Sequence, residues 1–287
     1  MDARHADGSP LSPDAMIARR LRQHREARNL SQRALADLVG YPQSYISRAE
    51  NQLQRIGDGL AEALDEKLGT NGEFVALLEM ARALLIEPGA RNVVARESEA
   101  IRVRVFTSSV MPGVLQTEAY ARALLRAGLP HDSASETEDR VAARLKRRTR
   151  LLDRRDPPLY RAVIDQAALL RPVAGPKVMS DQLRLLLSFQ DNVHVRIQIL
   201  PLTAGEHGMM GGSLNLLDLE SGGTLALVES FRTGEAIEAP REIVEYEELF
   251  EAAKEASLSV DDSANLFTRY LQEYDNDRLP PLGLAQE

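Results

Sequence analysis

Residues 21–51 read LRQHREARNLSQRALADLVGYPQSYISRAEN, and this stretch decides how the N-terminal part of the chain folds. Apolar residues recur at helical spacing on both sides of Gly40, and glycine is the residue type that best adopts a left-handed turn conformation. Ser31 can cap a first short helix, and Pro42 can start a second one. Two short helices joined by a tight turn predict a helix-turn-helix.

The apolar positions predict which faces of these two helices are buried. Leu35, Ala36 and Leu38 are expected to point inward from the first helix, and Ile46 and Ala49 from the second. The second helix then keeps a polar outer face that consists of Gln43, Ser44, Ser47 and Arg48. Gln can pair with adenine and Arg with guanine through two hydrogen bonds each, which discriminates by about 1–3 kcal/mol. We therefore predict that this face reads bases in the major groove.

The stretch resembles the signature of the phage-repressor-like helix-turn-helix family, the Xre or Cro/C1 type. The resemblance covers about residues 13–85 and is carried by Leu30-Ser31-Gln32, Leu35-Ala36, Gly40, Ile46-Ser47 and Glu50. It implies a five-helix domain whose base-reading residues are Gln43, Ser44, Ser47 and Arg48, and whose phosphate-contacting residues are Gln32, Asn51 and Arg55. It also implies that Glu50 supports the fold. Gln52 departs from the family pattern, which often has Gly where the second helix ends.

Charge is distributed unevenly along the chain. The formal net charge is −8, yet residues 17–56 contain eight Arg and three acidic residues, so this part carries +5 and the remainder −13. The basic side chains are Arg19, Arg20, Arg22, Arg25, Arg28, Arg33, Arg48 and Arg55. Such a segment can be attracted to the DNA backbone, while an acidic remainder is repelled by it. The asymmetry favours a regulator made of two parts.

Length and composition exclude several classes of protein. A chain of 287 residues is long enough for two domains, and the absence of Cys excludes disulfides, thiolate zinc sites and thiol nucleophiles. No apolar run of about 18 residues is present, and the N-terminus is polar. We therefore expect a cytoplasmic protein with neither a membrane span nor a secretory signal.

We predict a helix-turn-helix domain over residues 13–86, an α+β domain over residues 95–275, and flexible tails at 1–12 and 276–287. Ser12 is the expected cap of the first helix, and the fourth and fifth helices are expected over Asp58–Leu68 and Glu73–Leu85. Glu87-Pro88-Gly89 interrupts the helical pattern and marks the domain boundary.

The second domain alternates strand and helix patterns. Strands are predicted over residues 101–106, 159–165, 193–200, 213–219 and 224–228. Helices are predicted from residue 117 and over residues 136–152, 177–189, 241–256 and 261–274. The expected fold class is mainly α with α+β, in which the second domain contains a small antiparallel sheet.

The second domain resembles the C-terminal domain of a large actinobacterial regulator family that includes WhiJ-type developmental regulators and is often described as antitoxin-like. The resemblance spans about residues 95–275 and is carried by Pro112-Gly113-Val114-Leu115-Gln116-Thr117-Glu118, Tyr120-Ala121, Arg140, Arg144, Gln182-Leu183, Ile199-Leu200-Pro201, Gly205 and His207. It implies a domain of unassigned biochemistry that binds a small acidic BldB-like protein, commonly encoded next door.

Four arginines on one predicted helix are candidates for binding an acidic partner or an anion, and a solvated helix face explains them equally well. The partner or ligand candidates are Arg140, Arg144, Arg147 and His207, with Arg148 next to them. His207 lies in a glycine-rich loop over residues 205–212, which lacks the sequence ending of a phosphate-binding loop. The His residues are scattered without HxxxH or HxH spacing, so we predict no metal site, and no cofactor is predicted.

The sequence therefore predicts a sequence-specific transcriptional regulator that is controlled through its C-terminal domain. One recognition helix covers few base pairs, so we expect a homodimer on two half-sites about 34 Å apart or a multiple of that distance. The alternative is an antitoxin-like module that binds a small acidic partner and uses DNA binding mainly for autoregulation. An enzyme is disfavoured, because no nucleophile–base pair and no paired catalytic carboxylates are visible.

Overall fold

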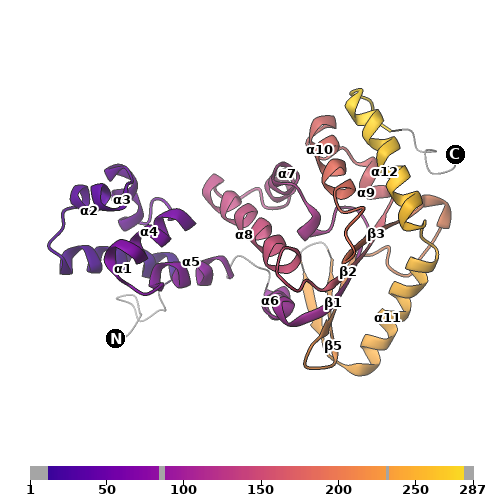
Figure 1. Cartoon of the computed structure of the whole chain (residues 1–287), viewed down its shortest axis with the longest axis horizontal. Coiled ribbons are helices and arrows are strands. Elements are labelled where there is room, and N and C mark those ends of the chain that lie inside the picture. Colours follow the sequence, from indigo (N-terminus) through magenta and orange to yellow (C-terminus); the bar gives the residue numbers. More distant parts are fainter. Residues whose placement is uncertain (1–11, 84–87, 231–232, 281–287) are drawn as a thin grey trace. The chain divides into compact units, whose positions relative to one another are not determined.

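The computed structural model describes residues 12–83, 88–230 and 233–280, which fall into two compact units (Figure 1). The N-terminal unit comprises residues 1–86 and 133–139, and the C-terminal unit comprises residues 87–132 and 140–287. Most of the predicted tails lies outside the described residues, as does the predicted end of the fifth helix at Leu85.

Within residues 12–83, the N-terminal unit consists of the helices α1 (Pro13–Ala27), α2 (Gln32–Val39), α3 (Gln43–Glu50), α4 (Asp58–Leu68) and α5 (Glu73–Ala83). The predicted caps are confirmed, because Ser12 Oγ accepts the Ala15 N–H at 3.2 Å and Ser31 Oγ accepts the Ala34 N–H at 3.1 Å. Gly40 ends α2 with a φ of +75°, as the turn requires. The predicted helix-turn-helix is therefore confirmed.

Each of these helices buries one apolar face in a common core. Its fully buried members include Leu21, Leu35, Ile46, Leu64 and Phe74. The prediction that Leu38 points inward is wrong, because its side chain is 42% exposed and Val39 is buried instead. At 3.6 residues per turn, Leu35, Ala36 and Val39 lie within one arc of α2, and Leu38 points away from it.

The C-terminal unit is built on a six-stranded sheet with the order β3-β2-β1-β4-β5-β6. Its strands are β1 (Ala100–Thr107), β2 (Leu159–Asp165), β3 (Val195–Leu200), β4 (Ser213–Leu219), β5 (Thr224–Glu229) and β6 (Gly234–Ile237). The predicted α+β class is confirmed. The antiparallel arrangement holds from β1 through β4 and β5 to β6, but β2 and β3 run parallel to β1. Helices connect β1 to β2 and β2 to β3, and such connections return the chain to the same end of the sheet.

Helices flank the sheet, with α11 on one face and α6 on the other (Figure 1). The helices of this part of the chain are α6 (Pro88–Arg96), α7 (Glu118–Gly128), α8 (Ala134–Leu152), α9 (Ala167–Leu170), α10 (Pro176–Leu187), α11 (Pro240–Glu255) and α12 (Val260–Asp275). Short 3-10 helices are η1 (Glu97–Glu99), η2 (Gly113–Leu115) and η3 (Leu202–Ala204). Sequence reasoning missed α6, because Pro88 was interpreted as a break, although proline suits the first turn of a helix.

Residues that precede and begin α12 cover part of the outer edge of β3. The Ile199 N–H donates to Ser263 Oγ at 3.0 Å, and the Ile199 carbonyl accepts the Leu258 N–H at 2.9 Å. Gln198 Nε2 donates to the Leu258 carbonyl at 2.8 Å. Polar groups of the edge strand are thereby satisfied within the chain.

Helix α6 packs on β6 through two glycines. A Cβ atom built on Gly89 would lie 1.6 Å from the carbonyl oxygen of Gly234, a distance that no real side chain can accept. The two backbones are therefore in direct contact, and only glycine fits at position 89.

The substitution Gly89→Ala is predicted to destabilise the C-terminal unit by about 1–3 kcal/mol, because the new methyl group forces α6 away from β6. Chemical denaturation followed by circular dichroism measures the change. Gly128→Ala is the matched control, since a Cβ at Gly128 meets nothing within 4 Å. Equal stability of the Gly89→Ala variant and the wild type would contradict the direct backbone contact.

Candidate nucleic-acid interface

The polar residues of α3 face solvent, and its apolar residues face the core. Gln43, Ser44 and Arg48 are exposed and Ser47 is half-buried. Ile46 and Ala49 are buried on the opposite side, as the spacing predicts. The four predicted base-reading residues therefore share the outer part of one helix, although their contact with bases stays a prediction.

Glu50, the last residue of α3, holds that helix through a fully buried carboxylate. Arg25 of α1 binds both carboxylate oxygens, with Nε 2.6 Å from Oε1 and Nη2 3.1 Å from Oε2. Gln32 of α2 donates to Oε2 at 2.8 Å. The hydrogen bond to Glu50 raises the pKa of Arg25, against the effect of desolvation. One carboxylate thus connects three helices and sets how α3 is presented.

Two of the predicted phosphate-contacting residues, Gln32 and Asn51, also help to hold α3 in place. Gln32 Oε1 accepts a hydrogen bond from Gln43 Nε2 at 3.3 Å, while its amide nitrogen binds Glu50. Asn51 Nδ2 donates to the Ser47 carbonyl at 2.9 Å, and its Oδ1 accepts from Arg22 at 3.2 Å. Asn51 is exposed and Gln32 is half-buried, so both side chains lie beside the outer face of α3.

Arg55, the third predicted phosphate contact, is paired with two carboxylates of its own unit. Its Nη2 lies 2.6 Å from Asp14 Oδ2, and its Nη1 lies 3.2 Å from Asp139 Oδ2. Desolvation lowers the pKa of Arg55, but the two carboxylates outweigh it and the pKa is raised. A DNA phosphate would therefore have to compete with Asp14 and Asp139 for this guanidinium.

The charge count from the sequence overestimates the positive charge that faces solvent. Arg20 Nε lies 2.6 Å from Glu73, Arg25 binds Glu50, and Arg28 donates to the Leu68 carbonyl. Four of the eight arginines, Arg20, Arg22, Arg25 and Arg55, are paired with carboxylates, which compensate part of their charge. Arg48 is exposed and belongs to α3.

The chain leaves α3 through a left-handed residue. Gln52 has a φ of +59°, in the region that L side chains rarely adopt. This is the position at which the resembled family often has Gly. The backbone requirement is therefore the same, and Gln52 meets it under strain.

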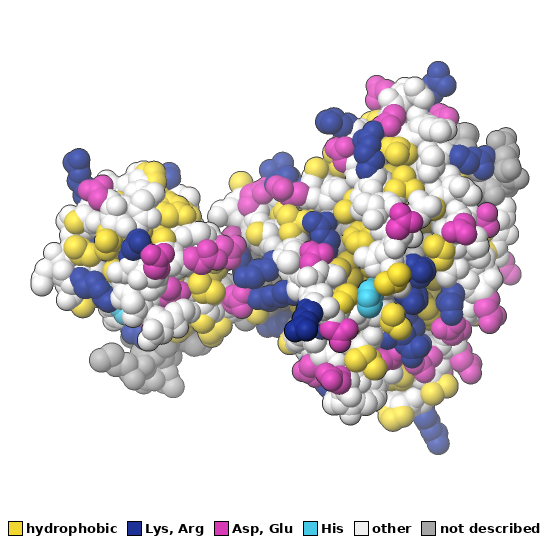
Figure 2. Space-filling model, in the orientation of Figure 1, with side chains coloured by type: hydrophobic (Ala, Val, Ile, Leu, Met, Phe, Trp, Pro, Cys, Tyr) yellow, Lys and Arg dark blue, Asp and Glu magenta, His cyan; other side chains and the backbone are white. Residues whose placement is uncertain are grey.

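Four arginines of α8, Arg140, Arg144, Arg147 and Arg148, are half-buried and make contacts within the chain. Arg140 Nε lies 2.7 Å from Asp132 Oδ2, and Arg147 Nε lies 2.7 Å from Glu97 Oε2. Arg144 Nη1 donates to Gln116 Oε1 at 2.8 Å. Figure 2 shows basic side chains gathered over the region of α8 and α6. A purely solvated helix face does not explain these contacts.

His207 lies on the face of the sheet opposite to the one that Arg147 contacts. Its Nε2 lies 3.2 Å from Asp165 Oδ2, and the Met209 N–H donates to its Nδ1 at 3.3 Å, so Nε2 carries the proton that Asp165 accepts. Phe106 meets the imidazole edge-on at 5.3 Å between ring centroids. Arg147 interacts with Tyr160, which lies five residues before Asp165 on β2 and therefore on the opposite face. The predicted set of Arg140, Arg144, Arg147 and His207 is thus not one site.

Residues 112–117, which carry part of the resemblance described above, form a buried turn. Gln116 Nε2 donates to the Met111 carbonyl at 2.6 Å, and Gln182 Nε2 of α10 donates to the Leu115 carbonyl at 2.6 Å. Burial raises the pKa of Tyr120 to about 12, and its hydroxyl accepts the Met111 N–H at 3.3 Å. Sequence reasoning did not assign these roles, although a polar residue inside an apolar string is the signal of a buried hydrogen bond.

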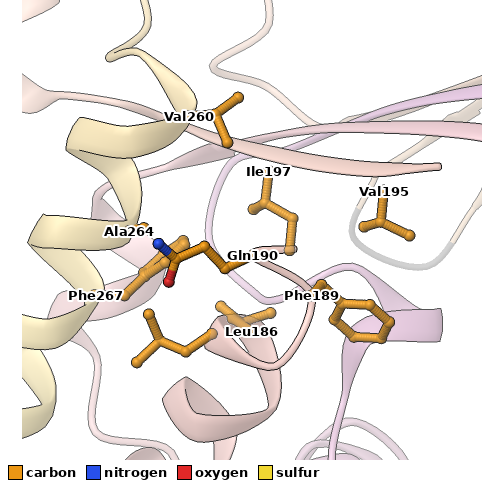
Figure 3. Close-up of a pocket in the computed structure, with 9 residues that line it drawn as sticks. Leu186, Phe189, Gln190, Val195, Ile197, Val260, Ala264 and Phe267 are labelled. Atoms are coloured by element: carbon orange, nitrogen blue, oxygen red, sulfur yellow. The ribbon is translucent and has the colours of Figure 1, made fainter. Parts of the chain in front are cut away.

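A small pocket between α10, β3 and α12 is almost entirely apolar (Figure 3). Side chains of Leu186, Ile197 and Phe267 converge on it, and the amide of Gln190 lies at its edge. Its volume is about 20 Å³, which holds roughly one water molecule and is far below the size of small-molecule sites. In the same described ranges, no group of three His, Asp or Glu side chains could hold a metal ion.

The exposed polar helix α3, anchored beside α2 by a buried carboxylate, defines a helix-turn-helix DNA-binding domain. Residues 17–78 match the family model described as a helix-turn-helix domain, which supports a DNA-binding regulator. Residues 90–269 match the family described as a domain of unknown function (DUF5753), and the chain belongs to that family. No curated protein and no solved structure matches the chain. None of the helices in the described residues combines the length and the apolar composition needed to cross a bilayer.

The substitution Arg25→Ala is predicted to destabilise the N-terminal unit by about 3–5 kcal/mol, because it leaves the buried Glu50 carboxylate without its main partner. Urea denaturation of the full chain measures the loss. Arg33→Ala removes the same charge from an exposed position and is expected to change stability by less than about 0.5 kcal/mol. Similar effects of the two substitutions would show that the Glu50–Arg25 pair does not hold the domain.

The substitution Gln52→Gly is predicted to stabilise the N-terminal unit by about 1 kcal/mol, because glycine adopts the left-handed conformation without strain. Thermal unfolding compares it with Gln52→Ala, which removes the same side chain but keeps the strain. A gain with Gly and none with Ala supports the backbone explanation. Equal effects would attribute the change to the loss of the Gln side chain.

Proposed function

We propose that this chain is a sequence-specific transcriptional regulator that inserts α3 into the major groove. The observation that carries the proposal is the exposure of Gln43, Ser44 and Arg48 on a helix whose other side is buried and anchored by Glu50. Gln and Arg offer the bidentate hydrogen bonds that distinguish adenine and guanine. In this proposal Gln32, Asn51 and Arg55 contact phosphates on either side of the groove.

We further propose that it binds as a homodimer. A helix of eight residues, Gln43–Glu50, reaches only a few base pairs, and one half-site of that size occurs too often to be specific. Two copies that bind half-sites about 34 Å apart, or a multiple of that distance, double the number of base pairs that are contacted. The C-terminal domain is proposed to control this binding, and the proposal assigns it no catalytic step.

The first test is a fluorescence-anisotropy titration of the full chain with its own upstream DNA and with a scrambled duplex at physiological salt. A preference of about a thousandfold for the upstream DNA is expected for specific operator binding. Equal, weak and steeply salt-dependent binding to both duplexes would count against specific recognition by α3 alone.

A second candidate function is an antitoxin-like module that captures a small acidic protein. The half-buried arginines of α8 favour it, because guanidinium groups near a surface can bind carboxylates in a bidentate geometry. Size-exclusion chromatography of the chain mixed with the small acidic protein encoded next door distinguishes the two functions. A stable complex that abolishes DNA binding supports the second candidate, and separate elution excludes it.

The substitution Arg48→Ala is predicted to weaken operator binding by about 1–3 kcal/mol, with the loss concentrated at one base pair. Anisotropy titrations against duplexes that carry single base-pair changes locate it. Arg33→Ala, which removes an exposed charge from α2, is the control and should not alter the base preference. Uniform weakening by Arg48→Ala across all duplexes would exclude Arg48 as a base reader.

Substitutions around Arg55 are predicted to change DNA affinity in opposite directions. Arg55→Ala removes a phosphate contact, so binding to every duplex weakens. The slope of log K against log salt concentration also falls in magnitude by about one. Asp139→Asn removes a competing carboxylate, so binding strengthens for every duplex. Asp37→Asn, on an exposed part of α2, changes net charge equally without touching Arg55. If Asp37→Asn and Asp139→Asn act alike, the effect is one of net charge and the competition is refuted.

A further inference from the structure

Arg144 differs from the other arginines of α8 in what it contacts. Arg140 and Arg147 each bind a carboxylate, from Asp132 and Glu97. In the part of the chain that the structure describes, the hydrogen bonds of Arg144 and Arg148 go to Gln116 alone, at 2.8 Å to Oε1 and 3.3 Å to the backbone carbonyl. Two neighbouring guanidinium groups therefore have neutral hydrogen-bond acceptors where their neighbours have charged ones.

The surroundings of Arg144 are unfavourable for a lone cation. Desolvation and, to a lesser extent, the nearby charge of Arg147 lower the pKa of Arg144 to about 10. A half-buried guanidinium is costly where opposite charge compensates for only part of its lost hydration, and Glu229 offsets only part of the lowering of the Arg144 pKa. An anion at this place would remove that cost.

The balance of charge around Arg144 also favours an anion. Glu229 attracts Arg144 and Arg147 from β5, but its Oε2 already accepts a hydrogen bond from Asn215 at 3.2 Å. Glu97 is engaged by Arg147. Arg144 and Arg147 therefore have the carboxylates of Glu229 and Glu97 near them, and Arg148, which shares Gln116 with Arg144, adds a further positive charge.

An unsatisfied hydroxyl lies on the same face of the sheet. Thr107 of β1 and Glu229 of β5 are both paired with Ser213 of β4, and residues paired across strands point to the same face. Thr107 is buried, and its Oγ1 has no hydrogen-bond partner among the described residues. This face therefore holds a polar group that is still able to donate a hydrogen bond.

The space opposite the arginines is bounded by bare backbone. A Cβ atom built on Gly113 would lie 3.9 Å from both Arg144 Nε and Arg147 Nη1. Gly113 places no side chain there, so its backbone lies next to the guanidinium groups of both Arg144 and Arg147. Oxyanions bind to such pairs of arginines through several parallel N–H···O hydrogen bonds.

We propose that Arg144, together with Arg147 and Arg148, binds a small oxyanion, a phosphate or a carboxylate, beside Gly113 in the C-terminal unit. The site follows from the contacts of α8 and does not depend on DNA recognition. That its ligand acts as an effector of DNA binding is a separate step, which rests on the proposed function.

The test is the thermal unfolding of the full chain in increasing inorganic phosphate at constant ionic strength. The melting temperature of the wild type is expected to rise by a few degrees, because a ligand that binds the folded state stabilises it. The Arg144→Gln variant should lose this rise, while its melting temperature without phosphate stays equal to the wild type or higher. Arg155→Gln, an equal charge change at an exposed position beyond α8, should keep the full rise.

Other results would overturn the proposal. A rise that persists in Arg144→Gln shows that phosphate acts elsewhere, and a wild type that responds to neither phosphate nor acetate shows that no oxyanion binds. If the wild type does not respond to phosphate and the Arg144→Gln variant melts at a lower temperature, the role of Arg144 is to hold Gln116 in place. If Arg144→Gln fails to fold, Arg148→Gln takes its place, with the apparent phosphate affinity expected to fall several-fold and an unchanged affinity refuting the site.

Two further arms identify the source of the oxyanion. Stronger stabilisation by phosphate than by acetate at equal ionic strength indicates a phosphorylated small molecule, and the reverse order indicates a carboxylate. Anisotropy titrations with operator DNA, with and without the better ligand, test the effector role. If the ligand stabilises the chain but leaves DNA affinity unchanged, the site stands and only its link to the proposed function fails.

Discussion

A buried carboxylate cannot remain unpaired, and in the N-terminal unit this constraint fixes the orientation of α3. Glu50 has no access to water, so Arg25 and Gln32 must reach it, and the distances of 2.6 and 2.8 Å show that they do. Because the three side chains come from α3, α1 and α2, their pairing leaves α3 one orientation. The exposed face of Gln43, Ser44 and Arg48 is a consequence of that orientation.

Local signals predicted most of the secondary structure. Caps at Ser12 and Ser31, the left-handed Gly40 and the apolar periodicity of α4 each depend on residues within one or two turns. Such information is present in a short window of sequence, so α4 and the strands β2 and β4 are predicted with their observed bounds. Failures came where local patterns were ambiguous, as at Pro88, which can end a helix or begin one, and at Leu38, where three apolar neighbours compete for one face.

Long-range partners could not be predicted in the same way. Asp139 lies far along the chain from Arg55, and nothing in the residues around Arg55 indicates that it meets this carboxylate. The parallel pairing of β1, β2 and β3 depends on how connections cross the sheet, which alternation within a strand does not encode. For the same reason the sequence named Arg147 and His207 as candidates but could not show that they lie on opposite faces of the sheet. Chemistry was readable from the sequence, and proximity was not.

The closed edge of β3 has a consequence for self-association. The strand reads VRIQIL, an alternating β-prone segment of the kind that recruits further strands when its backbone is open. Leu258 and Ser263 already occupy the amide and carbonyl of Ile199, so a second chain cannot extend the sheet there without first displacing α12. The opposite edge strand, β6, has four residues and offers little length for pairing. The loop before α12 and the first turn of that helix therefore hinder strand pairing at Ile199, and substitutions at Ser263 should be judged by solubility as well as by stability.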